Sequence, residues 1–427
     1  MPRRGLLTYE NALVIILGLT FGFVFFDRQA ASNLMPFIQP SPSKGGLGLD
    51  QTQVGLIGAA LSATWAISAY GVGLISDRTG KRKPILILCV IGFSVCSVVT
   101  GLSKNFPTLI GARLLMGLLE GGVMPICLAI MTMESTESRR GLNAGIVQNA
   151  FSNLVGNAAG PVILVAIATT VGLGWRDAFF LSGIPGLLCA LAVWLWVKEP
   201  ARHDAGAEGH AIKHLNLFEM LKVRNVLVCS LVSIFMVSWL ITGFNFLPLY
   251  LVQIRGLTPT AMSHVMLALG ICAFIGGALV PALSDRVGRK PVLIFGCFLS
   301  VIGPMAMLWF HGPTIILATI LFFGWVGNCI FPMFMGTIPG ETLPRASVAT
   351  AMGIVVGVGE ILGGVCGPTL AGWLADHTAL GRPAEMYMMI ACAVIAGFIA
   401  LFLKETAPAK VGVAAEHRAE FVAQNVA

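Results

Sequence analysis

Twelve long apolar runs restrict what this chain can fold into. Each run is long enough, at 1.5 Å per residue, to cross a hydrocarbon core about 30 Å thick. Only 11% of the 427 residues are charged, whereas a soluble domain is typically about 25% charged. The sequence therefore predicts an all-α polytopic membrane protein whose transmembrane helices lie at residues 11–34, 54–76, 84–103, 107–133, 141–170, 175–197, 225–252, 261–283, 291–310, 313–340, 346–374 and 384–403.

The basic residues predict the orientation of these helices. Arg3 and Arg4 precede an apolar run that is too long for a signal-peptide core and lacks a small-residue cleavage site, so we expect a retained first helix. With a cytoplasmic start, 20 of the 27 Lys and Arg residues fall on cytoplasmic segments. The positive-inside rule then predicts that both termini are cytoplasmic. Short outer loops and the absence of any N-x-[ST] acceptor indicate a bacterial inner membrane.

Composition and motifs exclude several other classes of protein. The net charge of +7 follows from the asymmetry of the loops, so we expect no nucleic-acid partner. All ten cysteines lie in apolar runs without C-x-x-C spacing, and no G-x-x-x-x-G-K-[ST] or H-E-x-x-H motif occurs. We therefore predict no catalytic activity, no metal and no cofactor. The expected partners are the lipid bilayer and a small solute, and we expect a functional monomer.

The chain contains two related halves. Residues 77–84 after the second run return at 285–291 after the eighth, an offset of 208, and Gly160-Pro161 returns as Gly367-Pro368 at an offset of 207. This repeat predicts an amino-terminal six-helix bundle (1–197), a cytoplasmic linker (198–224), a carboxyl-terminal six-helix bundle (225–405) and a tail (406–427). Paired bundles of this kind place a substrate site at their interface near mid-membrane.

The repeated loop carries a recognisable pattern, Gly73-x-x-x-Asp77-Arg78-x-Gly80-x-Arg82-Lys83-Pro84. This pattern resembles the signature loop of the major facilitator superfamily, and the second copy has Pro281 in place of the first glycine. The resemblance implies two pseudo-symmetric six-helix bundles and a gating role for Asp77 and Arg78, with Asp285 and Arg286 as their counterparts. We expect the remaining basic residues of the loop to act mainly on topology.

Five ionisable residues lie inside predicted helices: Asp27, Arg28, Arg113, Glu120 and Glu360. A charge at mid-membrane costs at least about 2.5 kcal/mol, so the presence of these residues has to be explained. A structural cluster of ion pairs is one explanation. The alternative starts from charge balance, because the two cations and two carboxylates of the first half sum to zero. An added organic anion makes the site negative, and one proton on Asp27 or Glu120 restores neutrality.

A second resemblance sharpens this hypothesis. Asp27-Arg28, the segment from Arg113 to Gly122, and Pro125 are similar to the anion:cation symporter branch of the superfamily, which includes sugar-acid:proton symporters. The resemblance implies that Arg28 holds a substrate carboxylate, that Asp27 and Glu120 exchange the proton, and that Arg113 links them. It also implies a polar substrate contact in the fifth helix, where Gln148 and Asn149 both remain candidates.

The carboxyl half offers fewer candidates for the site. No Lys or Arg lies inside a predicted helix of this half, and Glu360 is a candidate for proton coupling. Asn328 lies 208 residues after Glu120, so the repeat places an amide where the first half has a carboxylate. Asn245, Trp239 and Trp325 are candidates for the carboxyl-half wall, and Asn245 and Asn328 are included among the predicted substrate-binding residues.

Three functions compete at this point. The first is proton-coupled uptake of a small organic anion such as a sugar acid or an aromatic carboxylate. The second is efflux by proton antiport, because Gly156-x-x-x-Gly160-Pro161 resembles part of the antiporter motif, although Val162 follows in place of further glycines. The third is a sensor or assembly factor without transport, which would be expected to carry a sizeable soluble domain.

Overall fold

A computed structural model describes residues 8–136, 139–200, 217–343 and 345–411. These residues form helices and connecting segments, and no strand occurs among them. Twelve helical stretches within them are long and apolar enough to cross a membrane, which confirms the predicted all-α class. Most of the predicted linker (201–216) and most of the tail (412–427) lie outside the described residues.

The chain divides into two compact units. Unit 1 contains residues 1–204 and 244–274, and unit 2 contains residues 205–243 and 275–427. Residues 244–274, which the sequence assigns to the second half, therefore cluster with unit 1. The division into two six-helix bundles with a linker at 198–224 stays a prediction.

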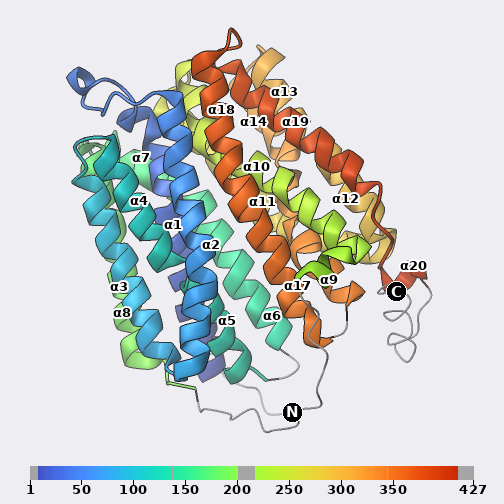
Figure 1. Ribbon diagram of the computed structural model, residues 1–427. Coiled ribbons are helices and arrows are strands. Elements are labelled where there is room, and N and C mark those ends of the chain that lie inside the picture. Colours follow the sequence, from blue (N-terminus) through green and yellow to red (C-terminus); the bar gives the residue numbers. More distant parts are fainter. Residues whose placement is uncertain (1–7, 137–138, 201–216, 344, 412–427) are drawn as a thin grey trace. The chain divides into compact units, whose positions relative to one another are not determined.

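Unit 1 is built around five long helices, α1, α2, α3, α4 and α8, which run side by side in Figure 1. Its elements are α1 (Tyr9–Ile38), η1 (Pro42–Lys44), α2 (Gln51–Thr79), α3 (Arg82–Gly101), α4 (Phe106–Glu120), α5 (Val123–Glu134), α6 (Arg140–Gly145), η2 (Ile146–Ala150), η3 (Ser152–Ala159), α7 (Gly160–Ala168) and α8 (Gly174–Trp196). Local chemistry sets some of these bounds. Asp50 and Gln53 form a capping box at the start of α2, and Gly80 ends that helix with a φ of 69°.

The described elements of unit 2 are also helices. The helices α10 (Arg224–Gln253) and α11 (Pro259–Val287) contribute to both units. The other elements of unit 2 are α9 (Leu217–Lys222), α12 (Arg289–Leu299), α13 (Ile302–Trp309), α14 (Thr314–Gly324), α15 (Val326–Cys329), η4 (Met333–Thr337), α16 (Ile338–Thr342), α17 (Arg345–Val358), η5 (Gly359–Gly364), α18 (Val365–His377), α19 (Pro383–Ala400) and α20 (Pro408–Val411).

The repeat seen in the sequence is also visible in the elements. Both α1 and α10 are 30 residues long, and both α2 and α11 are 29 residues long. The π-helical segments η3 and η5 begin at residues 152 and 359, which is the 207-residue offset of the Gly-Pro pairs that follow them. π-Helical turns often mark functional positions in helices.

Small residues bring α2 and α4 close together. A Cβ atom on Gly117 would overlap the Leu61 carbonyl, and one on Gly121 would overlap the Trp65 carbonyl. Glycines four residues apart line one face of a helix and permit this approach. The close contact holds the charged residues of α4 at a defined height beside α2.

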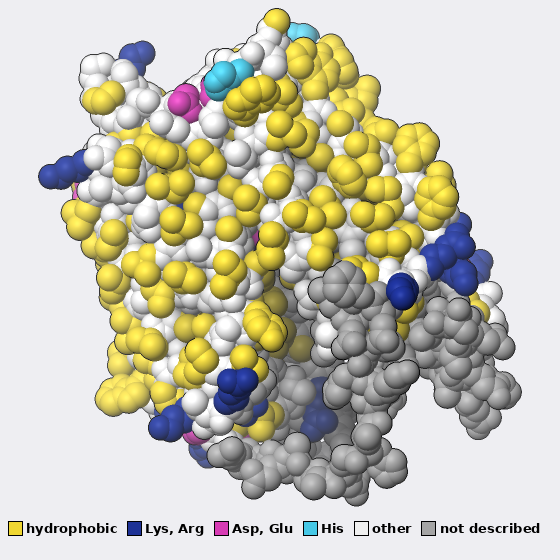
Figure 2. Space-filling model, in the orientation of Figure 1, with side chains coloured by type: hydrophobic (Ala, Val, Ile, Leu, Met, Phe, Trp, Pro, Cys, Tyr) yellow, Lys and Arg dark blue, Asp and Glu magenta, His cyan; other side chains and the backbone are white. Residues whose placement is uncertain are grey.

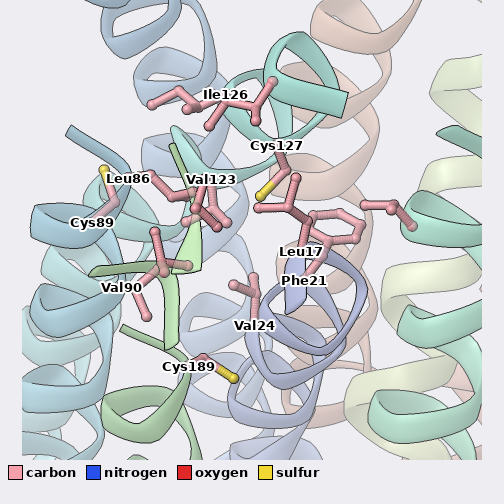
Figure 3. Packing of buried hydrophobic residues seen from close by; sticks show 14 of the residues in the cluster. Leu17, Phe21, Val24, Leu86, Cys89, Val90, Val123, Ile126, Cys127 and Cys189 are labelled. Carbon is pink, nitrogen blue, oxygen red and sulfur yellow. The ribbon is translucent and has the colours of Figure 1, made fainter. Parts of the chain in front are cut away.

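Buried apolar residues fill the interior of unit 1. Figure 3 shows Leu17, Phe21 and Val24 of α1 packed with side chains from α3, α5 and α8. Several residues in this cluster are fully shielded from solvent, among them Leu17, Val24, Leu86 and Val90. The cluster fixes the position of α1, which carries the first pair of charges.

Apolar side chains also cover the outer surfaces of the helices. Figure 2 shows hydrophobic side chains along the helices and basic side chains near the helix ends. Many large hydrophobic residues are exposed, including Leu88, Phe295 and Ile315 at 65%, 66% and 74%. This pattern is the one required of helices that face lipid.

Candidate functional site

The structure brings the four predicted charges of unit 1 together. Asp27 and Glu120 are completely buried, Arg113 is 3% exposed, and Arg28 is half-buried. Glu120 lies within electrostatic range of Arg113, Arg28 and Asp27. The two charged pairs predicted on the first and fourth transmembrane helices therefore form one cluster between α1 and α4.

Arg113 is bonded to the backbone of α1. Its Nη2 donates to the Arg28 carbonyl at 2.7 Å, and its Nη1 donates to the Asp27 carbonyl at 3.5 Å. Nη1 also contacts the sulfur of Met116 at 3.0 Å. Arg113 therefore holds α1 at the level of the Asp27-Arg28 pair, and this contact was not expected from the sequence.

The two buried carboxylates make no close hydrogen bond among the described residues, although Arg113 lies within electrostatic range of both. Neither oxygen of Asp27 and neither oxygen of Glu120 accepts a hydrogen bond. The hydroxyls of Ser97 and Ser182 interact with the Asp27 carboxylate, and Ser182 Oγ also lies 3.2 Å from Ser97 Oγ and 3.0 Å from the Phe179 carbonyl oxygen. No close ion pair joins Asp27 or Glu120 to an arginine among the described residues, although a structural cluster is expected to satisfy its carboxylates with hydrogen bonds.

Arg28 lies between aromatic rings. Its guanidinium carbon is 5.8 Å from the centre of the Phe25 ring and 5.3 Å from that of Trp65. Its Nη2 is 3.5 Å from the hydroxyl of Ser62 on α2. Aromatic faces attract a guanidinium and hold it in place, so Arg28 is positioned before any ligand arrives.

The two candidates of the fifth transmembrane helix are neighbours in the chain, and the structure records a side-chain contact for Gln148. Gln148 and Asn149 both lie in the π-helical segment η2. Gln148 Nε2 contacts the sulfur of Met124 on α5 at 3.6 Å, whereas the Asn149 carbonyl accepts from Ser152 and Asn153 within its own helix. The Gln148 side chain is therefore directed towards α5.

Sequence reasoning missed two asparagines in the same helix. Asn157 Nδ2 donates to Asn153 Oδ1 at 2.9 Å, and Asn157 Oδ1 is buried without a partner among the described residues. The signal was present, because Asn149, Asn153 and Asn157 recur every four residues and share one helix face.

Asn245, a candidate for the carboxyl-half wall, clusters with unit 1. It is 7% exposed, and its Oδ1 accepts from the Ser32 hydroxyl of α1 at 3.2 Å. Its Nδ2 has no partner among the described residues.

Unit 2 places aromatic and amide groups in its interior. Trp239 and Trp325 are 0% and 3% exposed, and their ring centres are 4.9 Å apart. Asn328 is half-buried on α15. Glu360 is half-buried in the π-helical segment η5, whose glycines Gly359 and Gly363 contact Ser233 and Ile234 of α10.

The second signature loop forms an ionic network that centres on Arg289. Arg289 Nη2 lies 2.5 Å from Asp285 and 2.8 Å from Glu341. Arg286, the predicted counterpart of Arg78, is exposed, as is Arg78 itself, and the Asp77 side chain lies outside the described residues. The sequence emphasised the adjacent Asp-Arg pair, but the i,i+4 spacing of Asp285 and Arg289 is the one that joins side chains on a helix.

A glutamate caps the helix that follows each signature loop. Both Glu199 oxygens accept from the backbone of α3, from Arg82 N at 2.6 Å and Lys83 N at 3.0 Å. Glu405 does the same at α12, where Arg289 N and Lys290 N donate at 2.7 and 3.1 Å. Carboxylates suit helix amino termini because the first backbone amides lack partners.

Comparison with a family model agrees with this architecture. The model described as Major Facilitator Superfamily matches residues 17–355 and 244–425. The chain belongs to this superfamily. It is therefore a multi-pass membrane protein with a transport function and not an enzyme, as the signature loops predicted.

Individual relatives in the superfamily share about a quarter of their residues with this chain. The probable 4-methylmuconolactone transporter of Cupriavidus pinatubonensis is 28% identical over 392 residues, 89% of this chain and 87% of the relative. The hexuronate transporter of Bacillus subtilis is 27% identical over 396 residues, 86% and 89% of the two chains.

A solved structure shows the same fold. The crystal structure of a D-xylose-proton symporter matches 93% of this chain and 99% of its own with a TM-score of 0.74 at 18% sequence identity. This likeness supports the major facilitator superfamily fold of twelve helices.

Proposed function

We propose that this transporter is a proton-coupled symporter that takes up a small organic anion, such as a sugar acid or an aromatic carboxylate. The observation that carries the proposal is the pair of completely buried carboxylates, Asp27 and Glu120, which make no close hydrogen bond and lie in one cluster with Arg28 and Arg113. Two relatives are named as transporters of hexuronate and of 4-methylmuconolactone, which supports a small organic substrate.

The coupling follows from charge. Two guanidinium groups and two carboxylates sum to zero, and a bound monovalent anion leaves one negative charge in a region of low dielectric. One proton on Asp27 or Glu120 removes that charge, so anion and proton favour each other's binding. A buried carboxylate that is already paired would exchange its proton less readily, which is why the absence of partners matters.

The roles of the residues follow from the same geometry. Arg28 anchors the substrate carboxylate, because a guanidinium can form two parallel hydrogen bonds with it. Arg113 transmits a change at the anion site to Asp27 and Glu120 through its bonds to the α1 backbone. Asn149, Gln148, Asn328 and Glu360 remain candidate contacts on other elements, and the signature loops act in alternating access between the two faces of a bacterial inner membrane.

Reconstituted liposomes test this function. Purified protein is placed in vesicles with an alkaline interior, labelled galacturonate or 4-hydroxybenzoate is added outside, and internal pH is followed with a trapped dye. We expect substrate accumulation accompanied by proton entry, and loss of accumulation when a protonophore is added. Accumulation that needs a sodium gradient, or anion uptake without proton entry, would contradict the proposal. Proton-driven export of the anion would favour the efflux antiporter.

A further inference from the structure

Polar and aromatic residues recur about once per helical turn on the facing surfaces of α1 and α2. On α1, Arg28 and Ser32 are one helical turn apart. On α2, Gly58, Ser62 and Trp65 follow the i, i+4, i+7 spacing of one helix face. Arg28 contacts Ser62 and the Trp65 ring, so the two faces are joined at the level of the proposed carboxylate anchor.

Asn245 contacts the same faces of α1 and α2 one helical turn further along. Its Oδ1 accepts from Ser32, one turn beyond Arg28, and a Cβ on Gly58 would overlap the Asn245 amide. Gly58 therefore leaves room for the amide between the two helices. All of these residues belong to unit 1.

The donor group of the Asn245 amide is not used by the described residues. Its Nδ2 is buried and has no hydrogen-bond partner among the described residues, although the side chain is only 7% exposed. A buried donor without a partner destabilises the site until a ligand supplies an acceptor. Trp65, 5% exposed, also has an Nε1 donor without a partner in the described chain. Two unused donors and one cation on the same faces suit a ligand that is rich in acceptors.

The aromatic rings favour a particular ligand shape. Phe25 and Trp65 both lie beside the Arg28 guanidinium, so a carboxylate bound there meets flat apolar walls. A planar ring directly attached to the carboxylate can stack on such walls, whereas a puckered ring that carries hydroxyl groups on both faces cannot do so without losing its hydrogen bonds to water.

We propose that Asn245 determines substrate specificity by donating from Nδ2 to a second oxygen of a planar ring carboxylate that Arg28 anchors. The inference rests on the proposed function and narrows its substrate class. Four residues of α-helix rise about 6 Å, so the second oxygen is a carbonyl-type acceptor about 6 Å from the carboxylate. Sugar acids become the poorer ligands.

A pair of matched probes tests the acceptor. 4-Acetylbenzoate carries a carbonyl oxygen opposite its carboxylate, and 4-isopropenylbenzoate has nearly the same shape with a methylene group in place of that oxygen. Binding of both probes and of galacturonate to the full chain in detergent is measured by calorimetry. One hydrogen bond contributes about 1.4 kcal/mol at the upper end of the usual range, so we expect 4-acetylbenzoate to bind about tenfold more tightly than 4-isopropenylbenzoate.

Two variants then assign the preference to Asn245. Asn245→Leu removes the donor at similar size, and the ratio of the two dissociation constants should fall towards one. Asn245→Asp keeps an acceptor for Ser32 and removes the donor, so 4-acetylbenzoate should lose its advantage there as well. Thermal unfolding without ligand verifies that each variant is folded, and a folded Asn245→Asp suffices if Asn245→Leu is not.

The outcomes separate this inference from the proposed function. Equal affinity of the native chain for both probes, or an unchanged ratio in either folded variant, would overturn the role of Asn245. Tight binding of galacturonate with no binding of either ring probe would overturn the substrate class and leave anion symport intact. If none of the three carboxylates binds, both the inference and the proposed function are wrong.

Discussion

Two membrane carboxylates of unit 1 are buried differently from Glu341 and Glu385 of unit 2. In unit 1, Asp27 and Glu120 are completely buried and make no close hydrogen bond or ion pair among the described residues. In unit 2, Glu385 is equally buried but lies 2.9 Å from Arg382, and Glu341 pairs with Arg289 at 2.8 Å. A paired buried carboxylate is compatible with a structural role, whereas an unpartnered one is costly and needs a function. The repeat therefore preserved helices and loops but placed the proposed coupling chemistry in one unit.

The largest expected effect tests the arginines of the two units. Arg28→Ala should weaken binding of an anionic substrate about 100-fold, because losing one partner of a desolvated charge pair costs about 2 to 5 kcal/mol. Arg28→Lys should recover part of this loss, since an ammonium lacks the planar fork. Arg382→Ala, the control in unit 2, should leave affinity unchanged. Calorimetry measures the substrate affinity of all three variants. Unchanged affinity in Arg28→Ala would show that Arg28 does not anchor the substrate carboxylate.

The carboxylates provide the next test of the comparison. Glu120→Gln and Asp27→Asn keep side-chain shape but cannot release a proton, so accumulation driven by a proton gradient should fail. Exchange of labelled for unlabelled substrate, which needs no net proton cycle, should persist. Glu385→Gln makes the same chemical change in unit 2, and the folded fraction should still accumulate substrate. Full accumulation by both unit 1 variants in liposomes would make Glu360 the next candidate.

A third prediction concerns stability and unit 2 alone. Arg289→Ala leaves Glu341 and Asp285 without their shared cation, and we expect a loss of about 3 kcal/mol in the free energy of unfolding. Arg286→Ala alters an exposed arginine three residues away and should change stability by less than about 0.5 kcal/mol. Equal thermal unfolding of the two variants would show that the Arg289 network contributes little.

The signature loops should affect rate more than affinity. Asp77→Asn is expected to slow turnover severalfold with little change in substrate affinity, because the sequence predicts a loop at the membrane surface, away from the binding site. Asp285→Asn, which weakens the pair with Arg289, should act in the same direction. Uptake rates and equilibrium binding are compared for each variant. A large loss of binding with normal turnover would contradict the gating role.

The smallest expected effect compares the two helix caps. Glu405 accepts from four backbone amides, those of Arg289, Lys290, Thr406 and Ala407, whereas exposed Glu199 accepts from Arg82 and Lys83. Glu405→Gln should therefore cost about 1 kcal/mol and Glu199→Gln less. Thermal unfolding of both variants measures this difference in stability. If Glu199→Gln were the more destabilising variant, burial and the number of hydrogen bonds would not determine how much each cap contributes to stability.

The sequence by itself determined the class of fold and pointed to the four charged residues that the structure brings together. Apolar runs predict helices reliably because every backbone polar group must be satisfied within the segment in lipid. The signature loops and the charges at Asp27, Arg28, Arg113 and Glu120 were also visible in sequence, because an ionisable residue in an apolar run stands out from its neighbours.

Only the tertiary structure decided which of these groups are partnered. Whether Glu120 and Asp27 accept hydrogen bonds, or Arg113 binds backbone carbonyls instead, depends on how α1 lies beside α4, and no local pattern contains that information. The same holds for Asn245, which the sequence assigned to the second half and which bonds to Ser32, 213 residues away. Helix periodicity specifies which side chains share a face, and packing between helices specifies what that face meets.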